Sequence, residues 1–225
     1  MKVLYEDNHI IIVYKESGEI VQGDKTGDRP LSETVKEWIK AKYNKPGDVF
    51  LGVVHRLDRP VSGLVAFGKT SKATSRLNKM FREGSVHKTY WAIVQGCPKN
   101  PEAELIHWIV RNERINKSFA YDHEVEEAKK AVLDYKVISH GDNYSLLEVN
   151  LKTGRHHQIR CQLSTIGCPI RGDLKYGARR SNSNGSISLL SHKIEFEHPV
   201  SHKLISVVSP LPDDRLWRAL AEGLE

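Results

Sequence analysis

Apolar residues recur along the chain with two spacings, and each spacing predicts one kind of element. Over residues 31–43, Leu31, Val35 and Ile39 recur at every fourth position, and Pro30 stands where a helix can begin. The sequence therefore predicts a helix over this range. Further helices are predicted by the same spacing over 71–83, ended by Gly84, over 155–166, ended by Gly167, and around Leu216, Trp217 and Leu220.

Runs of β-branched and aromatic residues between turn residues predict the strands. In the middle of the chain several such runs follow one another without a helical segment between them. We therefore expect an α+β fold with a mixed, largely antiparallel central sheet and flanking helices. No internal repeat and no long linker divides the chain, so one domain over residues 1–225 is expected. The predicted strands lie within 1–22 and at 49–54, 63–67, 87–95, 105–110, 130–138, 144–151, 187–196 and 203–208.

Composition narrows the class of protein. Hydrophobic residues make up 39% of the 225 residues, and the 16 glycines bring the apolar share to about 46%, which is typical of a globular chain and excludes global disorder. The longest apolar run, Ile10–Tyr14, is far shorter than the roughly 18 residues that span a bilayer, and the acidic start of the chain does not fit a signal peptide. Three cysteines without a CxxC pair predict neither a disulfide framework nor a zinc site, and they favour the cytoplasm.

Positive charge points to a polyanionic partner. The formal net charge is +6 and the pI is near 9.1. Lys72, Arg76 and Lys79 recur on one side of the predicted helix 71–83, where phosphates would offset their repulsion, although a solvated basic face explains them equally well. Further cations gather later in the chain, at Arg171, Lys175, Arg179 and Arg180. The last two open a polar segment, 179–186, that predicts a mobile loop.

The segment His55–Lys69, HRLDRPVSGLVAFGK, crowds charges into a turn between two predicted strands. Two interpretations remain open for its carboxylate. Asp58 either caps the turn and pairs with Arg56 or Arg59, or it acts as a nucleophile or base that an arginine keeps ionised.

A second segment, TGRHHQIRCQLSTIGCPIRGDLKYG over 153–177, surrounds the predicted helix 155–166. Arg160 falls off the apolar face of that helix, so we expect an exposed cation. His156 and His157 are adjacent and are expected to point to different helix faces, which argues against a metal site. In a third segment, HKTYWAIVQG, Tyr90 alternates along a predicted strand, which predicts a buried core side chain.

Together these segments resemble the RluA-type family of pseudouridine synthases. The family hallmark HRLDxxTSGLLLxAK is matched by HRLDRPVSGLVAFGK, and KxYxAxVxG by KTYWAIVQG. The pattern TGRxHQIRxHLxxxGxPIxGDxxYG is matched by the segment 153–177, and the later HPV turn by residues 198–200. The sequence departs from the family at Val61, where threonine is usual, at Gln162, where histidine is usual, and at Ser191.

The resemblance implies residue roles. Asp58 is expected to be the catalytic aspartate, Tyr90 the ring beneath the target base, and Arg160 the partner of the aspartate. Either Arg160 or His157 is expected to fill the space that the everted base leaves. Further contacts with the substrate are expected from Arg56, Leu189, Lys72, Arg76 and Lys79.

The resemblance also implies an activity. It indicates an RNA pseudouridine synthase that isomerises uridines in ribosomal or transfer RNA, in a two-lobed catalytic domain around a cleft. No cofactor, metal, membrane or separate N-terminal RNA-binding domain is expected, and the expected state is a cytoplasmic monomer. Two other functions stay open. One is a catalytically silent RNA-binding or chaperone module, and the other is an N-glycosidic hydrolase that releases the free base. The polar loop 179–186 is expected to become ordered on RNA.

Overall fold

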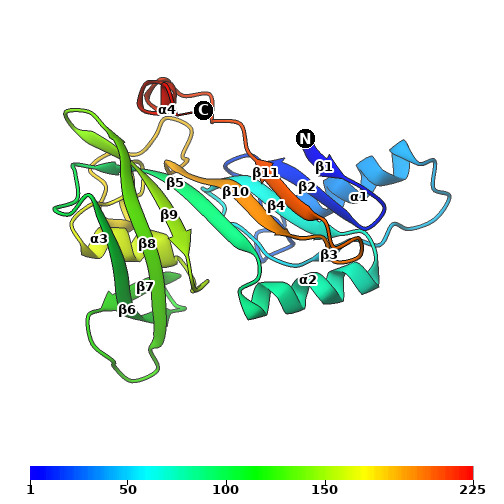
Figure 1. Ribbon diagram of the computed structural model, residues 1–225, viewed down its shortest axis with the longest axis horizontal. Helices are drawn as coiled ribbons and strands as arrows, with labels where there is room; N and C mark the ends of the chain where they lie inside the picture. Colours follow the sequence, from blue (N-terminus) through cyan, green and yellow to red (C-terminus); the bar gives the residue numbers. More distant parts are fainter. Residues whose placement is uncertain (225) are drawn as a thin grey trace. The chain divides into compact units, whose positions relative to one another are not determined.

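The computed structural model describes residues 1–224, and these form two compact units (Figure 1). The first unit contains residues 1–87 and 191–210. The second contains residues 88–190 and the chain from Leu211 onward. The chain therefore passes from one unit to the other three times, and neither unit is continuous in sequence.

The first unit is a sheet with two helices. Its strands follow the order β1-β2-β4-β10, with β3 next to β4 and β11 next to β10. The pairings β1–β2, β2–β4, β3–β4 and β10–β11 are antiparallel. Its elements are β1 (Lys2–Glu6), β2 (Ile10–Lys15), α1 (Leu31–Lys42), β3 (Gly52–Val53), β4 (Ser62–Gly68), α2 (Ser71–Glu83), β10 (Leu189–Glu197), which begins in the second unit, and β11 (Leu204–Val208).

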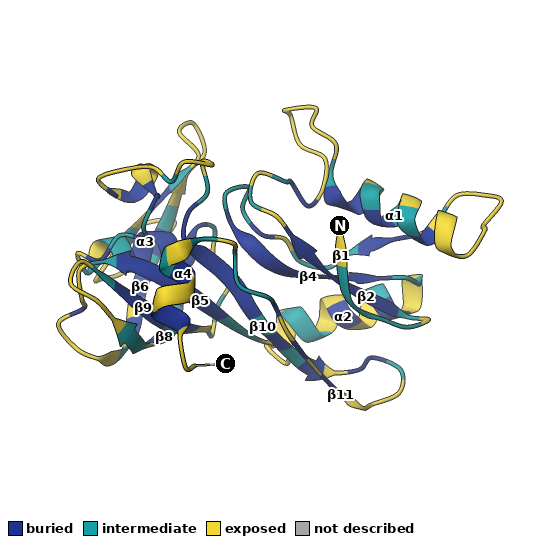
Figure 2. Ribbon diagram, turned by 90° about the horizontal axis from the view of Figure 1, so that it is seen from above, coloured by how far each residue is buried: buried dark blue, intermediate teal, exposed yellow. Residues whose placement is uncertain are grey.

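Helix α2 lies close to the strands because two glycines leave room for it. Gly52 and Gly68 are paired across β3 and β4, and a Cβ on either would lie within about 2.2 Å of the Thr74 side chain. The helix begins at an N-cap, Thr70, whose hydroxyl accepts the N–H of Ala73, and it ends at Gly84 in the left-handed conformation. In Figure 2 the helix shows a buried side and an exposed side, as its sequence spacing predicts.

The second unit is an antiparallel sheet in the order β5-β9-β8-β6-β7. Helix α3 contacts β6 and β7, and helix α4 contacts β8 and β9. The elements are β5 (His87–Gln95), β6 (Glu102–Asn112), β7 (Lys117–Tyr121), β8 (Lys129–His140), β9 (Tyr144–Leu151), α3 (Gln158–Thr165), a 3₁₀ turn (Leu174–Tyr176) and α4 (Arg215–Ala221).

The α+β class with a largely antiparallel sheet is confirmed, whereas three local predictions are wrong. The strand expected at 49–54 covers only Gly52–Val53. Strand β7 was not predicted, because its sequence KSFAY has no β-branched residue and it becomes a strand by pairing with β6. Helix α3 begins at Gln158 rather than near 155, because Gln158 Oε1 accepts the Arg155 N–H and holds the preceding turn.

Candidate active site

Asp58 lies in the loop between β3 and β4, and a buried lysine supports this loop. The N–H of Val61 donates to the carbonyl of Asp58, closing a turn at 3.0 Å. Beneath the turn, Lys15 is fully buried at the end of β2. Its Nζ donates to the carbonyls of Arg59 at 3.1 Å, Val61 at 2.6 Å and Glu16 at 3.0 Å. The ammonium thereby ties the residues after Asp58 to the first unit's sheet.

Burial lowers the pKa of Lys15 to about 8, although nearby carboxylates, among them Glu19 and Asp58, act in the opposite direction. Lys15 was missed by the sequence analysis. The available signal was a lysine that directly continues the buried run Ile10–Tyr14, where an apolar residue or a turn is the usual continuation.

The other charged residues of this segment have separate roles. Arg59 forms an ion pair with Asp28 at 2.6 Å, so its guanidinium fastens the neighbouring loop. His55 Nε2 accepts the N–H of Ala66 at 2.9 Å, and its ring stacks on Phe81. Because that nitrogen accepts, a neutral His55 carries its proton on Nδ1. Arg56 is exposed, as a residue that contacts a large substrate would be.

Tyr90 lies in β5 opposite Val149 of β9 and is 7% exposed. The prediction of a buried position for its ring is confirmed. Leu189, expected to line the substrate pocket, is the first residue of β10 and is also buried. Asp58 belongs to the first unit, whereas Tyr90, Arg160 and Leu189 belong to the second.

The prediction that Arg160 is an exposed cation is wrong, because the residue is 5% exposed. Its Nε and Nη2 donate to the two carboxylate oxygens of Asp173, at 2.7 and 3.0 Å. Its guanidinium also lies over the ring of Tyr176, 5.0 Å from the centroid. Asp173 is 1% exposed, so burial of the cation is balanced by a buried anion in two-point contact.

His157 completes this cluster. Its Nδ1 lies 2.8 Å from the Tyr176 hydroxyl, which already accepts the N–H of Ser118. Burial, and then the charge of Arg160, lower the pKa of His157 to about 2, so the ring is neutral. Burial raises the pKa of Tyr176 to about 12, so its hydroxyl keeps its proton and donates it to His157 Nδ1. The histidine therefore carries its own proton on Nε2.

The expectation that His156 and His157 point to different helix faces is also wrong. Both residues precede α3, and His157 has a left-handed backbone with φ of 53°. Their rings stack with centroids 3.7 Å apart. Among residues 1–224, no group of three or more histidine, cysteine, aspartate or glutamate side chains is arranged to hold a metal ion.

The cations of α2 differ in their surroundings. Arg76 Nη1 donates to the carbonyl of Pro199 at 2.5 Å, so this arginine fastens the turn after β10. Lys72 and Lys79 are exposed, and Lys79 lies 3.9 Å from Glu83. Arg76 is exposed as well, so all three cations of the predicted basic face lie at the surface, and Arg76 is the one held by a backbone carbonyl.

The three departures from the family pattern occupy supporting positions. Val61 is buried at the end of the Asp58 loop. Gln162 is fully buried and its Nε2 lies 2.9 Å from His107 Nδ1. Ser191 Oγ donates to the carbonyl of Leu64 in β4 at 3.2 Å. All three side chains are therefore part of the packed interior rather than of the surface.

Comparison with known proteins gives consistent matches. Residues 9–165 match the family described as RNA pseudouridylate synthase. The ribosomal large subunit pseudouridine synthase D of Zymomonas mobilis is 30% identical over 227 residues, which cover 95% of this chain and 70% of that protein. An uncharacterized RNA pseudouridine synthase of Chlorobaculum parvum is 32% identical over 238 residues, covering 94% of this chain and 71% of that protein.

The fold has a solved counterpart. The structure of human RNA pseudouridylate synthase domain containing 4 superposes with a TM-score of 0.80 and 22% identity, covering 98% of this chain and 92% of the human one. At this level of identity the likeness concerns the fold. Within residues 1–224, no helix combines the length and the apolar character that crossing a membrane requires.

Proposed function

Because the chain belongs to the RluA-type family of RNA pseudouridine synthases, which are isomerases, we propose that it converts specific uridines of ribosomal or transfer RNA to pseudouridine with Asp58 as the catalytic carboxylate. One observation carries the proposal: the family match spans residues 9–165 and so includes Asp58, Tyr90 and Arg160. The three passages of the chain between the units support one catalytic domain.

The reaction suits a single carboxylate. Isomerisation breaks the bond between C1′ and N1 of uridine, turns the detached uracil and joins C5 to C1′, and the proton displaced from C5 is balanced by one gained at N1. Asp58 would attack C1′, attack the uracil ring, or remove a sugar proton, and each route needs the ionised carboxylate. Glycoside hydrolases commonly use a second carboxylate to protonate a leaving group that departs, whereas here the leaving group is retained.

Arg160 and Tyr90 have complementary roles in this proposal. A guanidinium beside Asp58 would favour the charged form of the carboxylate, and the two-point contact with Asp173 restricts how the Arg160 guanidinium can turn. Eversion of the uridine costs a few kcal/mol, and stacking on an aromatic ring such as that of Tyr90 returns roughly 1–3 kcal/mol. The ring of His157 is neutral, so its hydrogen-bonding pattern does not depend on pH in the neutral range.

The printed name of the Zymomonas relative makes large-subunit ribosomal RNA the first substrate to test. Pseudouridines are mapped in total RNA from cells with and without the gene. A site that disappears in ribosomal or transfer RNA on deletion identifies the substrate. An unchanged pseudouridine map would contradict the proposed activity.

Asp58→Asn tests the catalytic role on that RNA. The change removes a charge but little volume, so pseudouridine formation should fall to background while RNA affinity stays within a few fold. Asp48→Asn, at an exposed position of the same unit, is the matched control and should retain full activity. Substantial activity in Asp58→Asn would place the catalytic carboxylate elsewhere. Release of free uracil by the unaltered protein would instead favour a hydrolase.

A further inference from the structure

A cavity of about 800 Å³ lies within the second unit, and of the site residues described above only Tyr176 lines it. Its volume falls in the range of sites that hold small molecules or parts of larger ones. The wall is formed by the end of β5, the turn between β8 and β9, the end of α3 and the segment 176–180. The side chains that define its chemistry are Gln95, Asp142, Asn143, Tyr144, Arg179 and Arg180.

The two arginines give the cavity its charge. Arg179 and Arg180 are both exposed, and no carboxylate within residues 1–224 forms an ion pair with either. Two guanidinium groups that line one cavity without a carboxylate partner are available to an anion that enters it. Guanidinium groups bind phosphate through two parallel hydrogen bonds, which makes phosphate the matching anion.

The backbone that carries the arginines is fastened on both sides. Before them, the N–H of Arg179 donates to Gln95 Oε1 at 3.4 Å. After them, Asn182 Nδ2 donates to Ser186 Oγ at 3.2 Å and to Ser188 Oγ at 3.3 Å. The arginines therefore extend from a segment with defined attachments to the unit.

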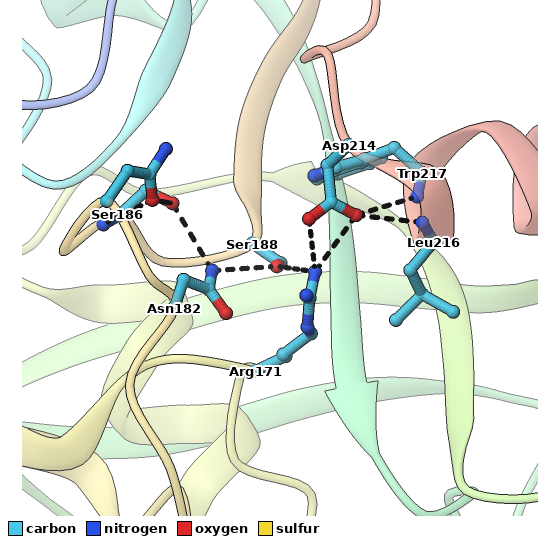
Figure 3. A network of polar contacts seen from close by, with 8 residues as sticks. Arg171, Asn182, Ser186, Ser188, Asp214, Leu216 and Trp217 are labelled. Carbon is cyan, nitrogen blue, oxygen red and sulfur yellow. Dashed lines mark hydrogen bonds and ion pairs between the residues drawn. The ribbon is translucent and has the colours of Figure 1, made fainter.

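Figure 3 shows how these attachments continue into the last helix. Arg171 Nη1 reaches both carboxylate oxygens of Asp214, at 3.1 and 3.0 Å, and lies 3.4 Å from Ser188 Oγ. Asp214 in turn caps α4 by accepting the N–H groups of Leu216 and Trp217. The hydrogen-bond network thus joins the arginine-bearing segment to the start of α4.

The remaining wall fits a nucleotide better than a bare phosphate. Gly96, Gly167 and Gly177 line the cavity, and a Cβ on any of them would meet no atom within 4 Å, so the space beside them is open. Asn143 supplies an amide for a base edge. Asp142, the one carboxylate among the lining residues, would repel an isolated phosphate but accepts hydrogen bonds from a ribose hydroxyl or a base amino group.

We propose that this cavity binds a nucleotide segment of the substrate RNA outside the catalytic residues, with Arg179 and Arg180 on its phosphates. The inference rests on the proposed function for the identity of the RNA. It adds a second point of attachment for a polyanion, consistent with the net charge of +6. Phosphate contacts position an RNA without selecting its sequence, so this site would contribute affinity and register.

The test is the salt dependence of RNA binding by the full chain. The probe is a fluorescein-labelled single-stranded 12-nucleotide RNA of mixed sequence, titrated by fluorescence anisotropy between 50 and 200 mM KCl. Each phosphate contact contributes about 0.7 to the slope of log K against log salt, so Arg179→Ala/Arg180→Ala should flatten the slope by about 1.4. Asn143→Glu, which adds a negative charge to the lining of the cavity and keeps both arginines, should weaken binding several fold.

A matched control distinguishes the effect of these two arginines from the effect of a lower net charge. Lys25→Ala/Lys40→Ala also removes two positive charges, at exposed positions of the first unit that do not line the cavity, and should keep the original slope. An unchanged slope in the arginine variant, or an equal change in the lysine variant, would overturn the proposal. Binding of uridine 5′-monophosphate as tight as that of the 12-nucleotide RNA would assign the cavity to a free nucleotide and overturn it too.

The two proposals can fail separately. Failure of the unaltered chain to form pseudouridine would refute the proposed function, whereas a flatter slope in the arginine variant would still show that the cavity binds RNA. Conversely, an active enzyme whose arginine variant keeps the slope would refute the cavity proposal alone.

Discussion

At the scale of single residues, the contacts of Arg160 decide what this side chain can do. A buried arginine without a counter-ion would be strongly destabilising, and Asp173 removes that penalty through two hydrogen bonds. The same two bonds fix the plane of the guanidinium over Tyr176. In the proposed reaction Asp173 is therefore a positioning residue for Arg160, acting through it rather than on the substrate.

We expect Asp173→Asn to lower kcat by about 10- to 100-fold, because it removes one charge-assisted bond and leaves the guanidinium poorly oriented. The affinity for RNA should stay within a few fold. Single-turnover measurements of pseudouridine formation, together with thermal melting by circular dichroism, separate orientation from stability.

Asp134→Asn serves as the control for Asp173→Asn, since Asp134 forms a half-exposed ion pair with Lys152 in the same unit. It should change neither rate nor affinity. An Asp173→Asn protein that folds normally and turns over at the original rate would exclude the positioning role.

Sequence alone identified Asp58, Tyr90 and Arg160 as candidates because the motifs around them are long. It could not show that Arg160 is buried, since the acid that allows burial comes 13 positions later, beyond the end of the helix. Nor could it show what Lys15 contacts, because the partners of this lysine are backbone carbonyls of a distant loop. Contacts to backbone atoms leave no pattern in the side chains.

At the scale of elements, Gly63 in β4 shows how closely two strands approach. Its φ is +116°, and a Cβ there would lie 2.4 Å from the carbonyl oxygen of Ser191 in β10. Only glycine tolerates both the conformation and the contact. The glycine that follows the Asp58 loop is thus required by packing against β10.

Gly63→Ala should therefore reduce the free energy of unfolding by about 2 kcal/mol or more, because a backbone atom has to move. Gly47→Ala is the matched control, since its Cβ would meet nothing within 4 Å, and it should stay within about 0.5 kcal/mol of the original. Urea denaturation followed by tryptophan fluorescence measures both. Equal stability of the two variants would mean that β4 and β10 are less closely packed than described.

The predicted elements agree with the observed ones where periodicity and end signals coincide, as in α2 with Thr70 before it and Gly84 after it. The predicted and observed elements differ where a contact made only in the folded chain sets the start of an element or creates it. Gln158 holds the turn that delays α3, and β7 depends on its neighbour β6 rather than on its own composition. Such contacts depend on the folded chain and have no periodic signature.

At the scale of the whole molecule, two buried histidines make stability depend on pH. Burial lowers the pKa of His157 to about 2 and that of His192, in the other unit, to about 4. In the unfolded chain both titrate near 6.5. Below that pH the unfolded chain binds protons that the folded protein does not, so stability falls as the pH is lowered.

At pH 4.5, two units below the unfolded value, His157 alone should cost about 3 kcal/mol of stability relative to neutral pH. His157→Gln keeps an acceptor for Tyr176 but cannot be protonated, so its stability should fall less between pH 7 and 4.5. Urea unfolding at both pH values gives the comparison. An equal loss of stability in the variant and in the original protein would contradict the burial of His157 as a neutral ring.

The division of the chain between the two units also determines when each unit can fold during translation. The first unit includes residues 191–210, which are synthesised only after the whole of 88–190 has been translated, and the second includes the segment that follows. A nascent polypeptide that stops before residue 191 therefore exposes an incomplete sheet in the first unit, while the second unit has all the strands of its own sheet and lacks only the segment with α4.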